Sequence, residues 1–436
     1  MGESSLLNLS QLRSFYEEHL FGHVLPFWLH KAIDADLGGY YTGFANSGGQ
    51  LLHTHKFTWS QGRFLWVWAR LASQFPDKAD AERYLQLAQS GAGFLMKYAL
   101  LPNGHCSFIL SREGKPILLD AQGRPREANP GETYATSTFA DCFVIYGLSE
   151  YARVTHDRAA FDFATRLFDS VEQRLAADQF RTDPYPTPPG YRQHGVPMIM
   201  LETSRELALT GDAFDPALAA SIRERTRFFA RQVMAEHRQA DKGVVIEFLG
   251  SDGTVQDNML GTYINPGHTL ESMWFVMHYA EEVGDERMLQ EAITTVRRAC
   301  ELGWDEQYGG IFQFVHMEGG RPRGRVLPEH EGSAMIQKLR SDWDAKLWWV
   351  HSEALYALLL AYYHCRQAWA QNWYGKVHEY TFNTFPAPEG EWIAIRNRDG
   401  TPVDKVVALP VKDPFHVPRA FMHILRLLAG RDWERG

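Results

Sequence analysis

Cysteine is scarce in this sequence of 436 residues, which contains only four. The four are scattered and form no Cys-x-x-Cys pair; they are Cys106, Cys142, Cys300 and Cys365. We therefore expect free, mostly buried thiols in a reducing cytosol, and neither a disulfide scaffold nor a paired-cysteine metal site.

Long hydrophobic runs and excess positive charge are also missing. No window approaches the apolar length that a membrane span needs. The first residues lack a basic segment followed by an apolar run, so we expect no signal peptide and a cytoplasmic protein that does not bind a membrane. A net charge of -9 without a basic stripe argues against a nucleic-acid partner.

Aromatic residues, in contrast, are abundant. They make up 13% of a chain that is 45% hydrophobic and includes 13 tryptophans. This composition is that of a globular protein with a large core. Clustered tryptophan and tyrosine suit either a thick helical core or a pocket whose walls stack on a sugar ring.

Helical periodicity dominates the chain and predicts an all-α protein of about twelve helices. No long Pro/Ser linker divides the sequence, so we expect residues 1–436 to form a single domain. The predicted helices span about 9–32, 59–75, 77–99, 136–155, 158–176, 196–210, 216–236, 266–284, 287–302, 344–365, 368–385 and 416–429.

Short hairpin-like segments recur between alternate helices. Each has glycine, a β-branched or aromatic run and a polar turn; they begin at Gly38, Gly104, Gly243, Gly309 and Gly390. The first two, and again the next two, lie about 66 residues apart. A further hairpin is expected near "QFRTDPYPTPPGY", where prolines have replaced it. This period predicts six helix pairs that close into an α/α toroid with hairpins around a funnel on one face; an open solenoid is the alternative.

Two segments combine tryptophan with charged residues near helix starts. In "KFTWSQGRFLWVW", Trp59 and Arg63 share a helix face, and an arginine among so many aromatics needs an anionic partner or ligand. In "DAKLWWVHSEALY", Trp348 and Trp349 are either core residues or, beside Lys346 and His351, a platform for a sugar.

Two histidines adjoin proline at predicted helix starts. They are His268 in "NPGHTLE" and His416 in "PFHVPR". The positive end of a helix disfavours the imidazolium, which keeps the ring neutral and able to accept a proton. Across a funnel, such a pair suits proton transfer to and from carbon, with Glu271 fixing the tautomer of His268 and Arg63 stabilising the oxyanion.

Four segments of the chain resemble the N-acylglucosamine 2-epimerase family, whose relatives include cellobiose 2-epimerases and mannose isomerases. They are "KFTWSQGRFLWVWARL", "NPGHTLESMWF", "KLWWVHSEALYALLLAY" and "EYTFNTFPAPEGEWIAIRNRDG" followed by "PFHVPRAFM". The resemblance runs in a consistent order from about residue 30 onward. It implies an (α/α)6 barrel that interconverts C2 epimers of an open-chain sugar through an enediolate, with no metal or redox cofactor, and commonly as a homodimer.

The resemblance also implies roles for individual residues. The acid/base pair would be His268 and His416, with Glu271 as the helix companion and Arg63 as the sugar-oxygen contact. Substrate-binding positions would be Trp59, Lys346, Trp348, Trp349, His351 and Glu202, the last where relatives that use unmodified sugars often carry another histidine. The chain has "ALPVKDPFH" in place of a glycine-rich "GGPFKG"-like run, so no ATP dependence is expected, although "FHVPR" is typical of the N-acyl epimerases.

Four other functions stay open at the level of sequence. An aldose–ketose isomerase of the mannose/fructose type would use the same residues and return the proton to C1. A glycoside hydrolase on the same fold would need two carboxylates from Asp141, Glu202, Glu271 and Glu353. A metal enzyme could use His268, Glu271, His351 and His416. The last is a sugar-binding protein without catalysis.

Overall fold

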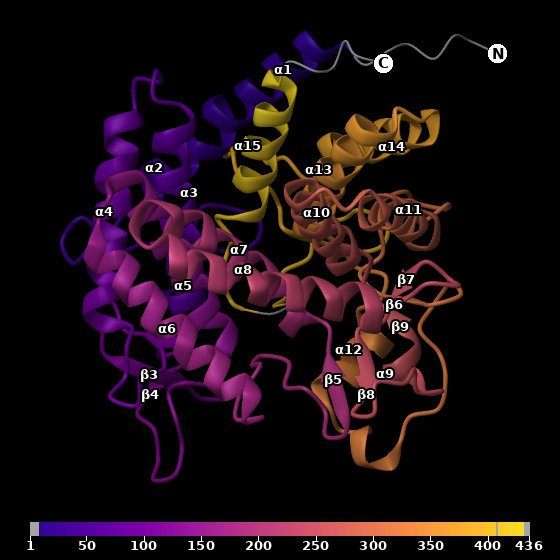
Figure 1. Cartoon of the computed structure of the whole chain (residues 1–436), viewed down its shortest axis with the longest axis horizontal. Helices are drawn as coiled ribbons and strands as arrows, with labels where there is room; N and C mark the ends of the chain where they lie inside the picture. The colour runs from indigo at the N-terminus through magenta and orange to yellow at the C-terminus, as the bar shows by residue number, and fades with distance from the viewer. Residues whose placement is uncertain (1–7, 407–408, 431–436) are drawn as a thin grey trace.

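Six helices form an inner ring in the computed structural model, which describes residues 8–406 and 409–430. The ring closes because each helix packs against the next and α15 packs against α3 (Figure 1). The inner helices are α3 (Thr58–Gln74), α5 (Thr138–Thr155), α7 (Gly195–Phe214), α10 (Pro266–Val283), α13 (Trp348–Cys365) and α15 (His416–Ala429).

A second layer of helices covers this ring, one on each inner helix. In the order of the inner helices they are α4 (Ala81–Tyr98), α6 (Arg158–Ala176), α8 (Pro216–Arg231), α11 (Glu286–Gly303), α14 (Ala368–Thr384) and, on α15, α1 (Leu9–Glu17). Figure 1 shows α1 in indigo and α15 in yellow side by side, so the early and late parts of the chain complete the toroid together. The predicted all-α toroid of six helix pairs is confirmed.

All twelve predicted helices are present with small shifts of their ends. The range 9–32 is realised as α1, a π-helical turn η1 (Glu18–Val24) and α2 (Leu25–Lys31), and a second π turn, η2 (Gln232–His237), extends α8. Three short helices were not predicted, because each has too few residues for a periodic pattern to emerge. They are α9 (Met259–Thr262), η3 (Pro328–His330) and α12 (Ala334–Ser341).

Short antiparallel strands lie on one side of the ring, in the lower half of Figure 1. One four-stranded sheet contains β1 (Lys56–Phe57), β2 (Ile109–Leu110), β3 (Pro116–Leu119) and β4 (Pro125–Arg126). The paired strands are β5 (Tyr191–Gln193) with β8 (Phe248–Gly250), β6 (Arg238–Gln239) with β7 (Val244–Val245), β9 (Tyr263–Ile264) with β10 (Val315–His316), and β11 (Lys346–Leu347) with β12 (Ile395–Arg396).

These strands fix where the inner helices begin. β1, β5, β9 and β11 run almost directly into α3, α7, α10 and α13, and each is paired with a strand from another loop. In the proline-rich segment near residue 185, an isolated bridge between Ser137 and Thr182 takes the place of a hairpin, and β5 starts only at Tyr191. The strand pairs therefore hold the helix starts at a common rim.

Inner and outer helices differ in burial as the architecture requires. Almost every residue of α13 from Val350 to Tyr362 is buried, whereas α11 buries one face only. A helix surrounded by others has no solvent face, so its apolar residues lose their periodic pattern. The expectation of free, mostly buried thiols agrees with the structure. Four free cysteines are present: Cys106, Cys142 and Cys300 are buried, and Cys365 is partly buried.

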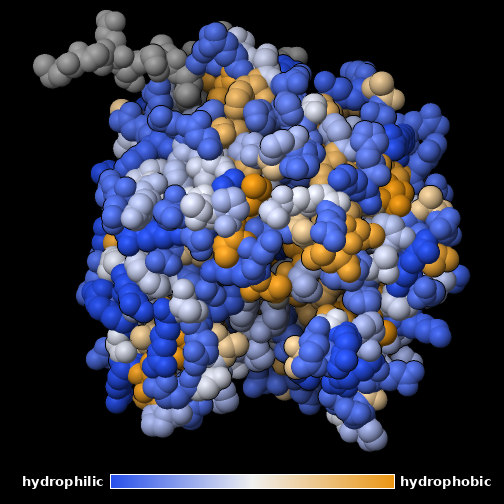
Figure 2. Space-filling view, turned by 180° about the vertical axis from the view of Figure 1, so that it is seen from behind, coloured by the Kyte–Doolittle hydropathy of each residue, from blue (hydrophilic) through white to orange (hydrophobic). Residues whose placement is uncertain are grey.

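The surface is mixed in polarity. Figure 2 shows the back of the molecule as mainly hydrophilic, with hydrophobic side chains near its middle in groups that polar residues separate. Within residues 8–406 and 409–430, no helix has both the length and the apolar character needed to cross a bilayer.

Two glycines allow the backbones of α3 and α5 to approach closely. A Cβ at Gly62 would lie 2.2 Å from the carbonyl oxygen of Phe143, and a Cβ at Gly147 would lie 2.4 Å from the carbonyl oxygen of Gly62. Both obstacles are backbone atoms, so no side-chain rotation relieves the clash. The ring can close at this diameter only with glycine at these positions.

Substitution of Gly62 by alanine tests this constraint. We expect Gly62→Ala to reduce the free energy of unfolding by about 1–3 kcal/mol or more, because α3 and α5 must separate. The matched control is Gly93→Ala in α4, where an added Cβ meets no atom within 4 Å and alanine stabilises a helix by about 0.5–1 kcal/mol. Urea denaturation of both variants measures the difference; equal stabilities would contradict the close crossing.

Candidate active site

The rim of the inner ring surrounds a cavity of about 620 Å³. Its size is typical of sites for small ligands. The first turns of all six inner helices contribute to its lining, as do residues from the hairpin side of the ring. Residues from the inner helices that line it include Trp59, Arg63, Phe143, Met198, His268, Glu271, Trp348, Trp349 and His416.

The common direction of the inner helices has an electrostatic consequence. Each helix carries a partial positive charge at its N-terminal end, where backbone N–H groups are unpaired. Six such ends converge on one cavity. The helix ends therefore add positive potential to a cavity that carboxylates such as Glu247, Glu271 and Asp413 also line.

The loop before α10 holds His268 at this rim. The side chain of Asn265 accepts a hydrogen bond from the His268 backbone N–H at 3.2 Å, and Pro266 occupies the first helical turn. A Cβ at Gly267 would lie 2.5 Å from Cη2 of Trp349. The sequence Asn-Pro-Gly-His thus starts the helix and also lets an indole pack against the histidine.

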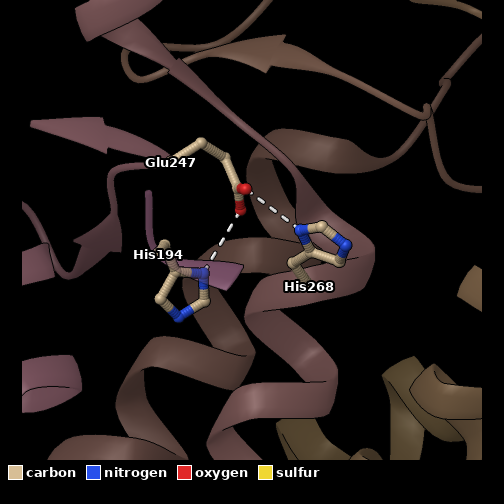
Figure 3. Close-up of side chains that lie close together, drawn as sticks. All are labelled: His194, Glu247 and His268. Atoms are coloured by element: carbon tan, nitrogen blue, oxygen red, sulfur yellow. Dashed lines mark hydrogen bonds and ion pairs between the residues drawn. The ribbon is translucent and has the colours of Figure 1, made fainter. Parts of the chain in front are cut away.

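Glu247 holds the imidazole of His268. In Figure 3 its carboxylate lies between two histidine rings, with Oε2 at 3.0 Å from Nδ1 of His268 and Oε1 at 3.4 Å from Nδ1 of His194. An ionised carboxylate only accepts hydrogen bonds, so both Nδ1 atoms carry the protons. Nε2 of His268 is consequently the ring nitrogen with a free lone pair, on a side chain that is 29% exposed and lines the cavity.

Charge pairing changes the proton affinity of these groups. Burial lowers the pKa of His268, but the charge and hydrogen bond of Glu247 and the charge of Glu271 raise it more, so the pKa lies above its usual value. Burial raises the pKa of Glu247, yet His268 and His194 lower it further and keep the carboxylate ionised. The pKa of His268 therefore shifts in the direction opposite to the one that a helix N-terminus alone would give, because of its pairing with Glu247.

His416, at the start of α15, also contacts a buried glutamate through Nδ1. Its Nδ1 lies 2.7 Å from Oε1 of Glu353, a buried residue whose Oε2 accepts a hydrogen bond from the Trp274 indole at 2.7 Å. Burial raises the pKa of Glu353, but Arg419 and His416 lower it more. The carboxylate again places the proton on Nδ1, and Nε2 of His416 is free to act as a base.

Glu271 does not bond His268 as the sequence led us to expect. Its Oε1 accepts a hydrogen bond from Arg419, which also donates to Glu353 at 2.8 Å. Oε1 of Glu271 lies 4.0 Å from Nδ1 of His416. The helix spacing correctly placed Glu271 at the cavity, but Arg419 of α15 reaches it first and Glu247 takes its expected role.

Arg63 lines the cavity and is paired as its aromatic surroundings require. Its Nη1 donates to Oδ1 of Asp413 at 3.1 Å, and its guanidinium stacks at 4.1 Å from the ring centroid of Phe143. Burial lowers its pKa, and Asp413 offsets part of that effect. Oδ2 of Asp413 accepts from the backbone N–H of His416 at 3.0 Å, so one carboxylate positions both Arg63 and the start of α15.

The three expected tryptophans all line the cavity. Trp349 contacts both candidate bases: its ring centroid is 5.5 Å from that of His268 and 5.5 Å from that of His416. Trp59 stacks on Phe143 with centroids 5.3 Å apart, and Trp348 lines the wall beside Trp349. All three indoles thus line the cavity wall, and their role as a platform for a sugar stays a prediction.

Lys346 and His351 do not reach the cavity. Lys346 is fully buried and donates to Asp305 at 3.1 Å, while Nε2 of His351 accepts the backbone N–H of Ile311 at 2.9 Å. The expectation that they contact substrate is corrected because their polar atoms bind the hairpin after α11. Burial lowers the pKa of His351 to about 3.

The first repeat of the chain contains the same two contacts. There Lys56 donates to Asp34 at 2.9 Å, and Gln61 accepts the backbone N–H of Tyr40 at 2.8 Å. Each acid precedes a Gly-Gly pair in the sequence, and each lysine precedes an inner helix. A lysine that recurs in two repeats as a hairpin clamp has a structural function.

Glu202 also lies away from the cavity lining. It is buried in α7, accepts from Arg205 at 3.2 Å, and burial raises its pKa to about 7. Of the four carboxylates considered for hydrolysis, only Glu271 lines the cavity in the described part of the chain. Asp141 is buried against Arg174, with 3.2 Å between them. No pair from those four candidates therefore faces the cavity.

Sequence reasoning missed several residues that complete the site. Asp413 and Arg419 stand beside His416 in the chain, and Glu247 is an acid within the apolar run "GVVIEFLG". His194 precedes Gly-Val-Pro at the start of α7, much as His416 precedes Val-Pro, so the proline pattern could have found it. Nothing in the spacing showed that Glu247 and His194 meet His268.

Comparison with known proteins agrees with this geometry. The family model described as "N-acylglucosamine 2-epimerase (GlcNAc 2-epimerase)" matches residues 39–420. The N-acylglucosamine 2-epimerase of Bos taurus is 31% identical over 402 residues, which cover 91% of this chain and 86% of the relative.

Solved structures share the fold at lower identity. A cellobiose 2-epimerase from Bacillus thermoamylovorans B4167 aligns with a TM-score of 0.74 and 17% identity, covering 96% of this chain and 99% of that chain. A D-mannose isomerase aligns with a TM-score of 0.72 and 17% identity, covering 97% and 99%. At these identities the likeness shows a common toroid.

The variant Glu247→Gln tests how the base is tuned. Removing the charge leaves burial as the larger influence, so we expect the pKa of His268 to fall. Titration of ¹⁵N-labelled histidine side chains by NMR measures it directly. The matched control is Glu318→Gln. The carboxylate of Glu318 lies 3.9 Å from Nδ1 of a different histidine, His316, so this variant should leave the His268 titration unchanged. An unchanged pKa in Glu247→Gln would show that the ion pair does not control His268.

Proposed function

The chain belongs to the N-acylglucosamine 2-epimerase family and is a carbohydrate epimerase, and from that premise we propose that His268 and His416 exchange the proton at C2 of an N-acylated hexosamine. The family membership confirms the resemblance that four sequence segments indicated. The single observation that carries the proposal is the shared arrangement of the two histidines: both line one cavity, and each binds a buried carboxylate through Nδ1.

The first step of the proposed reaction is proton removal from C2 of the open-chain sugar. Nε2 of one histidine takes the proton, the C–H electrons form a C1–C2 double bond, and the C1=O π electrons move to O1. The intermediate is an enolate with its negative charge on O1, because C2 of this substrate carries nitrogen in place of a hydroxyl. Arg63 and the converging helix ends stabilise that charge, because donors fixed in place need no reorganisation during the reaction.

The second step returns a proton to the opposite face of C2. The other histidine, protonated at Nε2, donates its proton to C2 and keeps the N–H electrons. The C1–C2 double-bond electrons form the new C–H bond while an electron pair of O1 re-forms the C1 carbonyl. Glu247 and Glu353 stabilise whichever imidazolium is present and keep each ring in the required orientation. Contact of Trp349 with both rings supports a sugar held between the two bases.

An N-acyl group on C2 is supported by two observations. The bovine N-acylglucosamine 2-epimerase is 31% identical over most of both chains. One part of the cavity wall is apolar and suits the methyl end of such a group; its residues are Phe139, Phe143, Met198, Ile199 and Phe248. Comparison of kcat/KM for N-acetylglucosamine, N-acetylmannosamine, glucose, mannose and cellobiose tests this assignment, with the N-acetylated pair expected to be preferred.

Single-histidine variants in deuterated water test the two-base mechanism. We expect His268→Asn and His416→Asn each to lower the epimerisation rate by about 10²–10⁴-fold. Each variant retains a base on one face, so it should still exchange the C2 proton of one epimer, and the two variants should act on opposite epimers. Product chromatography and ¹H NMR follow both processes.

The control for this experiment is His30→Gln, an exposed residue of α2, which should epimerise at the normal rate. Near-normal epimerisation by either active-site variant would contradict the proposal. A ketose product with the original enzyme would instead indicate an aldose–ketose isomerase.

A further inference from the structure

The cluster of His194, Glu247 and His268 has the composition of a metal site. One ligand atom from each residue can be chosen so that all three lie within 4.8 Å of one another. We propose that these residues bind a divalent transition-metal ion of the zinc type, and that its binding blocks proton transfer by His268. Figure 3 shows the carboxylate facing both imidazoles, with the three residues supplied by separate segments of the chain.

The ligand atoms lie near the spacing that a tetrahedral ion needs. Ligands at about 2.1 Å from such an ion lie about 3.4 Å from one another. Oε1 of Glu247 is 3.4 Å from Nδ1 of His194, its Oε2 is 3.0 Å from Nδ1 of His268, and one ligand atom from each residue lies within 4.8 Å of the other two. Two imidazoles and one glutamate form a common set of protein ligands for zinc, with water in the fourth position. Water can come from the cavity, which Glu247 and His268 line.

The surroundings of the cluster also suit a metal. Nε2 of His194 lies 3.2 Å from Oγ of Ser272, so a ring that coordinates through Nδ1 can donate its remaining proton to this hydroxyl. Both oxygens of the Glu247 carboxylate already contact imidazole Nδ1 atoms, one from each histidine. The ion would thus replace protons at nitrogen atoms that already face a negative charge.

A second cluster of possible metal ligands at the rim is less suited to an ion. Glu271, Glu353 and His416 also have ligand atoms within 4.8 Å of one another. However, the guanidinium of Arg419 donates to both carboxylates and lies 3.4 Å from Nδ1 of His416. A fixed cation already neutralises that cluster, so we assign the metal to the first one.

Metal binding at Nδ1 of His268 changes the other nitrogen of the ring. A neutral imidazole that coordinates through Nδ1 carries its only proton on Nε2. Nε2 then has no lone pair with which to take a proton from carbon. Inhibition rests on the proposed function of His268 as a base, whereas metal binding itself does not.

Metal titration of the full chain tests the site without an activity assay. Chelator-treated protein is titrated with ZnCl2 by calorimetry and with CoCl2 by visible absorption, where a tetrahedral ion gives intense bands. We expect one ion per chain. In ¹⁵N-histidine NMR spectra of the unmodified protein, zinc should shift the signals of His194 and His268 and leave those of His416 in place.

Variants assign the ligands. His194→Gln and Glu247→Gln should each weaken zinc binding by at least about tenfold. The matched control is His23→Gln, since His23 lies 3.7 Å from Glu18 in an exposed pair that belongs to neither three-residue cluster found among the described residues. Zinc should also inhibit epimerisation in proportion to occupancy, and EDTA should restore it.

Three results would overturn parts of this inference in distinguishable ways. Absence of stoichiometric binding by the unmodified protein, or normal affinity in both ligand variants, eliminates the site. Zinc binding that shifts the His268 signal while epimerisation continues eliminates the inhibition and, with it, the proposed function of His268 as a base.

Discussion

The arrangement of the site depends on one buried cation. Arg419, which is 2% exposed, donates to Glu271 of α10 and Glu353 of α13 while it belongs to α15. Charges removed from water are costly unless they are paired, and removing one partner leaves an uncompensated charge that typically costs about 3–5 kcal/mol. The positions of three inner helices relative to one another are therefore fixed. This relative position sets the direction in which His416 faces the cavity.

Glu247 pairs in the same way with His268, the other candidate base, from outside the inner ring. It comes from the loop segment between β7 and β8, and its two oxygens contact rings at the starts of α7 and α10. Two carboxylates, each with a histidine, thus determine which nitrogen of each imidazole is basic. Helix ends supply positive potential for the proposed enolate, but the carboxylates determine which nitrogen of each histidine carries the proton.

Much of the fold was predictable from sequence because it rests on local patterns. Helix periodicity, glycine turns and proline at helix starts gave the twelve helices, and the same helix starts led to His268, His416 and Arg63. Contacts between distant segments were not predictable. Lys346 looked like a sugar ligand beside Trp348, yet its partner Asp305 lies on another hairpin. Comparison of the Lys56 and Lys346 segments would have revealed the shared clamp, since both precede an inner helix and follow an Asp with Gly-Gly.

Closure of the ring also affects how the chain folds. α15 packs against α1 and α3, which precede it by more than 300 residues, whereas most helix contacts join neighbours in the chain. Contacts between such distant residues form slowly, because a long loop must be closed before they can contribute. Intermediates that lack this contact leave the apolar sides of α3 and α13 uncovered and prone to aggregation. Catalytic competence should therefore appear in the slowest phase of refolding, after most of the helical signal has returned.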